Sequence, residues 1–283
     1  MSRIAGLLID LAGKVLRKIP NIPGKSLYSK TLLKPIARRW EMERILPIRT
    51  GEVQLICQLT DWIPWNVYLH GSYIVEETYE KFLLKTAKEC RTVFDVGANI
   101  GYYTVQFAQK TNCTVYAFEP MEYQYNTLLR NLELNSLSDV HPTKKIVSDS
   151  EGKQRIYFSG MENTAASSVV NESDEFEEVP CISLDGFCAQ NHIEQIDLIK
   201  IDVEGFEFNV LKGLENMLKN QKISHLFIEI VERHLNKAGT SAKEVIDILK
   251  RNNYNGYSIK TGSPEPYVPG SDESLVYFKP SAG

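Results

Sequence analysis

Three carboxylates stand where apolar, strand-like segments end, and this position suggests a binding site. Asp95 lies within VFDV, Glu119 follows VYAF, and Asp202 follows DLIKI. Parallel strands present their carboxyl ends at one edge of a sheet, and open α/β sheets bind ligands at that edge. We therefore expect the three side chains to gather on one rim.

A glycine-containing turn, Gly97-Ala98-Asn99-Ile100-Gly101, follows the first of these strands. Glycines allow the backbone to bend sharply there and to approach a ligand closely. The GxxxG spacing differs from the GxGxxG typical of nicotinamide dinucleotide sites, and Asp95 before the turn disfavours a pyrophosphate. Glu119, about 20 positions further on, could accept hydrogen bonds from both ribose hydroxyls. These features favour S-adenosylmethionine, an adenosine ligand that carries positive charge and no phosphate.

The composition is that of an ordinary folded protein, with 283 residues, 43% of them hydrophobic and 24% charged. This length allows one large domain, or one domain with an appendage. The five cysteines are scattered and form no CxxC pair, which disfavours a disulfide framework or a zinc knuckle and favours a reducing cytosol. We expect no spanning helix, because no apolar run reaches about 18 residues. We also expect no cleaved signal, because Asp10 interrupts the apolar start of the chain.

The charge is distributed unevenly along the chain. The first 50 residues hold 11 basic and 3 acidic side chains, a net of +8, so the formal total of −4 leaves −12 for the rest. Residues 1–20 place apolar side chains at helical spacing, namely Ile4, Leu7, Leu8, Leu11, Val15 and Ile19. We expect an amphipathic helix there that packs against protein more readily than against lipid. Peripheral membrane contact through residues 1–20, with the protein at the inner face of a membrane, is kept as an alternative.

The elements that must position the carboxylates follow a strand-then-helix rhythm, which indicates a doubly wound α/β sheet. Helices are expected at 76–90, 123–135, 242–250 and through Leu211, Leu214 and Leu218. Strands are expected at 93–96, in the apolar segment that ends at Glu119-Pro120, at 146–147, in IDLIKIDVEG up to Asp202, and in HLFIEIVE up to about Glu229. YNGYSIK and SLVYFKP are expected to form an antiparallel pair.

Two regions interrupt this rhythm. Between residues 51 and 70, EVQLICQLT and WNVYLH alternate as strands do, and we interpret residues 1–90 as an N-terminal α+β cap on a catalytic domain, 91–283. Residues 150–180 suggest a hairpin and an acidic polar loop, in which Ser167 and Ser168 could contact substrate.

The motifs DVGANIGYYT, AFEP, SLD, IDLIKIDVEGFEFNVLKG and FIEI resemble, in order and spacing, the FkbM-type methyltransferases of the class I S-adenosylmethionine-dependent superfamily. The resemblance covers about residues 90–235 and implies a Rossmann-like, seven-stranded sheet whose last strand is antiparallel. It implies O-methylation of a hydroxyl, since the family's members act mostly on sugars or polyketides. A small molecule or glycan, and not nucleic acid, is therefore the expected partner, while the oligomeric state stays open.

The resemblance also implies roles for individual residues. Asp95, Gly97, Asn99 and Gly101 would surround the methionine part of the cofactor, and Glu119 the ribose. Ser148 and Asp149 would lie at the adenine. Ala98 and Pro120, in the same two segments, complete the predicted cofactor-binding set.

The strand end after DLIKI supplies candidates for the catalytic proton acceptor, because a positioned base speeds methyl transfer to a hydroxyl. Asp202 is the first candidate and Glu204 the second, although Glu204 could instead stabilise the N-terminus of the following helix. Lys200 shares a strand face with Asp202, so it could act in catalysis or simply pair with that carboxylate.

Other residues and functions are weighed against this interpretation. We expect no metal, although magnesium binding needs only one or two carboxylates. His234 is interpreted as a solvated loop residue rather than a substrate contact, and Trp62, Trp65 and Tyr68 either stack on a sugar or form a packed cluster. The alternative functions are a non-catalytic cofactor-binding or interaction protein and a nucleotide-sugar or nicotinamide oxidoreductase.

Overall fold

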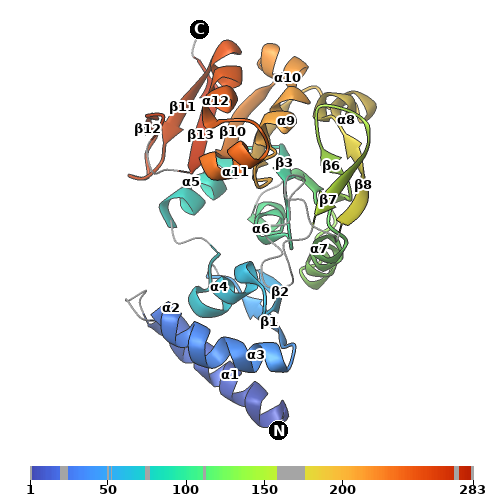
Figure 1. Ribbon diagram of the computed structural model, residues 1–283. Coiled ribbons are helices and arrows are strands. Elements are labelled where there is room, and N and C mark those ends of the chain that lie inside the picture. The colour runs from blue at the N-terminus through green and yellow to red at the C-terminus, as the bar shows by residue number, and fades with distance from the viewer. Residues whose placement is uncertain are drawn as a thin grey trace. The chain divides into compact units, whose positions relative to one another are not determined.

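The protein is described from a computed structural model in which residues 2–19, 25–49, 51, 53–73, 77–110, 113–157, 176–270 and 274–281 are placed. The chain divides into two compact units, one formed by Met1–Val75 and the other beginning at Glu76 (Figure 1). Helix α5 (Glu77–Ala87) belongs to the second unit, although it lies before the boundary predicted at residue 90. The division of roles between a cap and a catalytic domain stays a prediction.

The second unit is built on a sheet with the strand order β12-β11-β13-β10-β9-β3-β4-β5. Its strands are β3 (Thr92–Val96), β4 (Thr114–Phe118), β5 (Val140–Thr143), β9 (Ile196–Ile201), β10 (Ile223–Glu229), β11 (Tyr254–Ser258), β12 (Glu265–Pro266) and β13 (Leu275–Pro280). The strands from β5 to β10 are parallel, whereas β13 runs antiparallel between β10 and β11. The doubly wound sheet with an antiparallel last strand is confirmed, and the two-residue β12 adds an eighth strand.

The predicted third strand is wrong in its location. Residues 146–147 form β6 (Ile146–Val147), which belongs to a separate sheet with β7 (Gly152–Tyr157) and β8 (Phe176–Ile182). The main sheet instead takes β5, which pairs with β4. This strand reads VHPT, and its single strongly apolar residue gives no strand signal in the sequence. The predicted hairpin is confirmed as the antiparallel pair β7 and β8, while Ser167 and Ser168 lie outside the described residues.

Helices cover the sheet of the second unit. They are α5, α6 (Tyr102–Lys110), α7 (Glu122–Leu134), α8 (Leu184–Gln190), α9 (Glu207–Lys212), α10 (Glu215–Lys219), α11 (Glu232–Lys237) and α12 (Ala242–Arg251). The helix predicted through Leu211 and Leu218 is thus two short helices. Phe94 and Ile199 belong to a buried core that includes side chains of α8 to α12. Because side chains alternate along a strand, Asp95 and Lys200 point to the opposite face.

The first unit contains helices and a two-stranded antiparallel sheet. Its elements are α1 (Ser2–Lys18), α2 (Lys25–Tyr28), the π-helical turn η1 (Ser29–Leu33), α3 (Lys34–Arg39), β1 (Glu43–Pro47), β2 (Gln54–Gln58) and α4 (Trp62–His70). The strand predicted for WNVYLH is wrong, because this segment lies within α4, which ends at the left-handed Gly71. Most side chains of α4 are buried, so the segment is apolar on every side and shows no helical period.

Three further expectations concern the cysteines, a membrane-spanning helix and the N-terminal helix. All five cysteines are buried free thiols. Among the described residues, no helix combines the length and the apolar character that are needed to cross a membrane. Helix α1 is confirmed, and Ile4, Leu7, Leu8, Leu11 and Val15 lie on its exposed side. Packing of this stripe against another protein or against lipid stays a prediction.

Candidate active site

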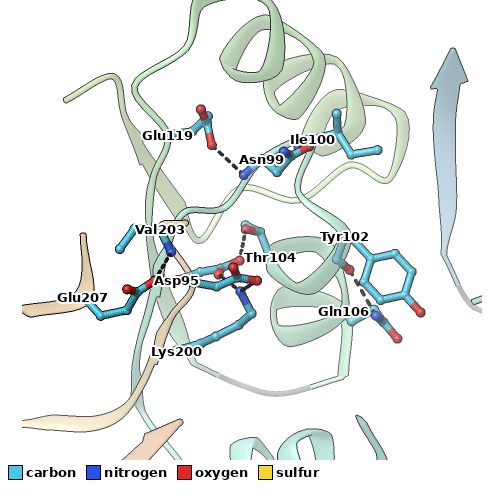
Figure 2. A network of polar contacts seen from close by, with 11 residues as sticks. Asp95, Asn99, Ile100, Tyr102, Thr104, Gln106, Glu119, Lys200, Val203 and Glu207 are labelled. Carbon is cyan, nitrogen blue, oxygen red and sulfur yellow. Dashed lines mark hydrogen bonds and ion pairs between the residues drawn. The ribbon is translucent and has the colours of Figure 1, made fainter. Parts of the chain in front are cut away.

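A buried network, in which one lysine contacts two carboxylates, lies at the bottom of the site. Asp95 on β3 and Lys200 on β9 are paired in the register of the parallel strands. The Lys200 Nζ lies 3.8 Å from Oδ1 of Asp95 and 3.1 Å from Oδ2 of Asp202. Thr104 on α6 donates its hydroxyl to Asp95 Oδ2 at 2.6 Å (Figure 2). The pairing of Lys200 with Asp202, the simpler of its two predicted roles, is present.

Burial acts on both members of the Asp95 and Lys200 pair. Burial raises the pKa of Asp95, while Lys200 and Thr104 oppose that rise. Burial also disfavours the charged form of Lys200, but the carboxylates of Asp202 and Asp95 outweigh this effect and raise its pKa. Lys200 therefore stays protonated and lies 5.1 Å from the centre of the Tyr103 ring. It lies beneath the rim, where it stabilises the negative charge of Asp202.

The glycine turn is held tightly between neighbouring strand ends. The backbone N–H groups of Gly97 and Ala98 both donate to the carbonyl of Phe118, and that of Asp202 donates to Val96. Gly97 has a φ of 79°, and a Cβ placed on it would lie 1.8 Å from the carbonyl oxygen of Asp202. A glycine is required here because the protein's own backbone passes so closely. The close approach of a ligand would be a second reason.

Glu119 secures the same turn from the end of β4. Its Oε2 accepts the N–H of Asn99 at 2.8 Å, and its Oε1 accepts the N–H of Met121 at 2.9 Å. Asn99 has a left-handed φ of 52°, so this hydrogen bond fixes an uncommon backbone conformation. Burial raises the pKa of Glu119 to about 7 despite the two N–H donors. Each carboxylate oxygen keeps a further lone pair with which it could accept a ribose hydroxyl.

The turn is also fixed by α7. Asn131 donates its side-chain amide to the carbonyl of Ile100 at 2.7 Å, and a Cβ on Gly101 would lie 2.5 Å from Leu128. Ala98 is buried within the turn, while Pro120 is half-buried after Glu119. The predicted turn residues therefore lie together at the ends of β3 and β4.

Ser148 and Asp149 lie after β6. Asp149 accepts a hydrogen bond from Lys212 at 2.7 Å, and this bond lowers its pKa, although burial opposes the change. Ser148 is buried, and its carbonyl would meet a Cβ on Gly213 at 2.0 Å. These contacts connect the segment to α9 and explain its fixed position, while an adenine contact stays a prediction.

A second group of polar side chains lies after β9 and β10. Glu204 has a left-handed φ of 53°, and its Oε2 lies 2.9 Å from Nδ1 of His234. Gly205, with a φ of 105°, leaves room for the His234 carbonyl, which would lie 2.6 Å from a Cβ. His234 is part of α11 and half-buried, so its interpretation as a solvated loop residue is wrong.

Burial and neighbouring acids change the proton affinity of this group. Burial raises the pKa of Glu204 to about 8, and Asp202 adds to the rise. The pKa of Glu229, at the end of β10, is raised well above its ordinary value by burial and then by Asp202 and Glu204. Burial lowers the pKa of His234, and Arg233 lowers it further. The rim thus holds two carboxyl groups, those of Glu204 and Glu229, whose pKa is raised by burial and by neighbouring acids.

Glu207 has the role that was considered for Glu204. It lies in the first turn of α9 and accepts the N–H groups of Val203 and Gly205 at 3.2 and 3.1 Å. Burial raises its pKa to about 7. Glu207 thus supplies a carboxylate at this helix start, while the role of Glu204 stays a prediction.

A groove begins at the same edge of the sheet, where β10 continues into Ile230. Its volume is about 680 Å³. Its apolar lining includes Ile230, Ile246 and Tyr267, and its charged lining includes Lys243, Asp247 and Lys250.

Comparison with known proteins identifies the family. The sequence profile of the Methyltransferase FkbM domain matches residues 95–256, which is more than half of the chain. The chain belongs to the FkbM methyltransferase family. It is therefore an S-adenosylmethionine-dependent methyltransferase, and the oxidoreductase alternative is excluded.

The chain is also similar to individual named proteins and to solved structures. The chain is 28% identical to the Hexuronic acid methyltransferase AglP of Haloferax volcanii over 195 residues, which cover 69% of this chain and 76% of that protein. It is 24% identical to Methyltransferase 1 of Beauveria bassiana over 171 residues, covering 53% and 67%. The O-methyltransferase from Bacillus cereus in complex with SAH is 15% identical, with coverage of 73% and 82% and a TM-score of 0.41.

The rim of this FkbM methyltransferase suits a cationic cofactor. Asp95 lies in β3, and Glu119 and Asp202 directly follow β4 and β9, the two neighbours of β3 in the sheet. Among the described residues, only Lys200 is a cation in ion-pair contact with any of these three carboxylates. The buried Oδ1 of Asp95 has no hydrogen-bond partner among the described residues. S-adenosylmethionine has an ammonium and a sulfonium group, so its positive charges complement the negative charges of these carboxylates.

The site also includes a trio that could hold a metal ion. Glu204, Glu229 and His234 offer ligand atoms that all lie within 4.8 Å of one another. An imidazole with two carboxylates suits a transition metal better than magnesium, which prefers oxygen ligands. The expectation of no metal stays a prediction.

The sequence identified some of these residues and missed others. Glu229 is the last residue of β10, and the predicted carboxylates lie at or next to the ends of β3, β4 and β9, so the strand-end rule could have included Glu229. Thr104 lies in the first turn of the helix that follows the glycine turn, so helical spacing could have indicated that it lies near Asp95. The proximity of His234 to Glu204 had no signal in the sequence, because it depends on the close passage at Gly205.

Proposed function

We propose that this enzyme is an O-methyltransferase that acts on a hydroxyl group of a sugar or glycoconjugate. The contact between Gly97 and the Asp202 carbonyl carries the proposal, because it holds the segment that bears Glu204 against the predicted cofactor turn. The sugar class is supported by the similarity to a protein named as a hexuronic acid methyltransferase.

In this proposal, the cofactor supplies an electrophilic methyl group, and the protein orients both reactants. Gly97, Ala98, Asn99 and Gly101 form the wall beside its methionine part, and Asp95 supplies negative charge beneath them. Glu119 and Pro120 lie at the ribose, and Ser148 and Asp149 at the adenine. In-line orientation of the hydroxyl and the methyl group supplies much of the rate enhancement.

The acceptor hydroxyl must lose a proton as the new carbon–oxygen bond forms. We assign this proton to Glu204, because it follows β9 and its carboxylate lies close enough to Asp202 for the two charges to interact. Burial also raises its pKa to about 8, within the range in which a general base is effective. Asp202, held by Lys200 at 3.1 Å, would accept a hydrogen bond from the hydroxyl and orient it. Lys200 is then a positioning residue, since only 5% of its side chain is exposed.

The groove beside Ile230 is the proposed place for the rest of the acceptor. Tyr267 offers an apolar ring of the kind that packs on a sugar face, and Lys243 and Lys250 could contact carboxylate or hydroxyl groups. Tyr267→Ala should raise the KM for the acceptor and leave the affinity for S-adenosylmethionine unchanged. An unchanged KM would place the acceptor elsewhere.

The function is tested by supplying S-adenosylmethionine with an isotopically labelled methyl group and a panel of hexuronic acids, neutral sugars and cell-extract glycans. The product is then treated with mild alkali before mass spectrometry. Transfer to a hydroxyl gives an ether that survives, whereas transfer to a carboxylate gives an ester that is hydrolysed. Alkali-labile label would exclude the proposed reaction, and label found only on proteins or nucleic acids would exclude the proposed acceptor class.

A further inference from the structure

The outer face of α1 is an exposed apolar surface. It consists of Ile4, Leu7, Leu8, Leu11 and Val15, and we call it the α1 stripe. Each side chain is more than half exposed, from 51% for Val15 to 72% for Leu7. Their spacing places all five along one side of the helix. Single exposed apolar residues are common, but a continuous row of five indicates an interaction surface.

The opposite face of α1 is fixed to the first unit. Ile9 is fully buried, and its carbonyl accepts the hydroxyl of Tyr68 at 2.6 Å. Gly13 lies so close to the Tyr68 ring that a Cβ would approach it to 2.4 Å. Asp10 and Arg44 form an ion pair at 2.5 Å. The core of this unit therefore uses one face of the helix and holds the α1 stripe outward.

Basic side chains border the stripe. Arg3, Lys14 and Lys18 are exposed and lie one helical turn from Leu7, Leu11 and Val15 respectively. The acidic residue of this helix, Asp10, is already paired with Arg44. An apolar stripe with flanking lysine and arginine suits a partner with two properties. The partner has negative charge at its surface, and it is apolar a few ångströms beneath that surface.

The neighbouring segment of the first unit has the same character. Leu27, Leu32 and Trp40 are exposed apolar side chains there, and Lys30 and Arg39 are exposed basic ones. Tryptophan is favoured at the boundary between lipid headgroups and acyl chains. Two copies of this chain joined through the α1 stripe would bring together two segments that each carry a net charge of +8, which disfavours a dimer.

We infer that the α1 stripe binds the surface of an anionic phospholipid bilayer, with α1 lying parallel to that surface. The leucines and Ile4 would enter the boundary between headgroups and acyl chains, and Arg3, Lys14 and Lys18 would contact lipid phosphates. The inference concerns the first unit and does not depend on the proposed acceptor.

The test is flotation of the full-length protein with vesicles of phosphatidylcholine alone, or of phosphatidylcholine mixed with phosphatidylglycerol. The wild-type protein should float with the mixed vesicles, and less so as salt is added. The double variant Leu7→Gln/Leu11→Gln should bind at least about tenfold more weakly, because two apolar side chains are lost. Lys14→Gln/Lys18→Gln should lose the preference for phosphatidylglycerol.

Val268→Gln is the matched control, because Val268 is equally an exposed apolar residue, at 68%, but lies in the second unit. It should float as the wild type does. Circular dichroism of each variant should be unchanged, since the altered side chains point to solvent. Equal flotation of the wild type and Leu7→Gln/Leu11→Gln, or no flotation of the wild type, would overturn the inference. Self-association that light scattering detects, and that this double variant loses, would assign the stripe to a second copy instead.

Discussion

Glu119 shows how one carboxylate can serve the fold and a ligand together. It is buried, accepts two backbone N–H groups, and fixes the left-handed Asn99 in the cofactor turn. Charged acceptors make stronger hydrogen bonds than neutral ones, so the turn gains most when Glu119 is ionised. Ligand hydroxyls would add donors to the same two oxygens and favour the ionised form further.

Glu119→Ala should therefore weaken the binding of S-adenosylmethionine by about 1.5–3 kcal/mol, through loss of hydrogen bonds to a charged group. Isothermal titration calorimetry measures this change. Glu133→Ala, on the exposed side of α7, is the control and should bind as the wild type does. Wild-type affinity in a folded Glu119→Ala protein would refute the ribose role.

Glu204 gives the reaction a pH dependence with a definite sign. It accepts a proton only when ionised, and burial raises its pKa from 4.5 to about 8 in the folded protein. The turnover rate should therefore rise with pH up to about 8 and level off above it. Glu204→Gln cannot ionise, so it should lose this rise together with about 10²- to 10⁴-fold of the turnover.

The exposed Glu215→Gln serves as the control for this pH profile and should leave it unchanged. If the rise persists in Glu204→Gln and disappears in Asp202→Asn, the proton is transferred to Asp202 instead. Loss of turnover on treatment with a chelator, restored by a transition metal, would assign Glu204, Glu229 and His234 to a metal site.

At the scale of elements, two loops share one narrow contact. The turn after β3 and the segment after β9 meet where Gly97 faces the carbonyl of Asp202. Gly97→Ala should destabilise the protein in two ways, through its positive φ of 79° and through a Cβ 1.8 Å from that oxygen. Because one loop must move, the variant should also bind S-adenosylmethionine more weakly.

Gly239→Ala separates these two effects. Gly239 has a similar φ of 73°, but a Cβ there would meet nothing within 4 Å. Gly239→Ala should lower the free energy of unfolding only through the unfavourable φ, by about 1 kcal/mol. The affinity for S-adenosylmethionine should be unchanged. Thermal melting and calorimetry compare the variants. Equal melting temperatures and equal affinities would show that the close contact at Gly97 has no energetic consequence.

The sequence predicted elements wherever a local pattern determined them. Strands β9 and β10 are continuous apolar runs, as buried parallel strands are, and both were predicted. Helix α4 was missed because a short apolar run is equally consistent with a strand or a buried helix. The strand-end rule brought Asp95, Glu119 and Asp202 together. It could not place His234 beside Glu204, since that contact arises from the path of the chain through α11.

At the scale of the whole molecule, the two compact units have separate hydrogen-bonded cores. Tyr68 in the first unit donates to the carbonyl of Ile9 at 2.6 Å, and Tyr254 in the second donates to that of Ile223 at 2.9 Å. Both hydroxyls are buried, and each connects segments that are distant in the sequence. The two tyrosines are therefore matched probes of the two units.

Tyr68→Phe and Tyr254→Phe should each lower the free energy of unfolding by about 1–3 kcal/mol, because a buried carbonyl loses its donor. Only Tyr254→Phe should lower the melting temperature of the unit that S-adenosylmethionine stabilises. Differential scanning calorimetry with and without the cofactor measures this difference. A single transition that both substitutions shift equally would show that the units unfold together.

The position of β13 has a consequence for synthesis of the protein. This strand, Leu275–Pro280, separates β10 from β11, so β11 and β12 have no place in the sheet before β13 inserts. While residues 275–280 remain inside the ribosome, β10 must expose an unpaired edge next to largely buried neighbours. The nascent chain is therefore more prone to aggregate before β13 has inserted than afterwards.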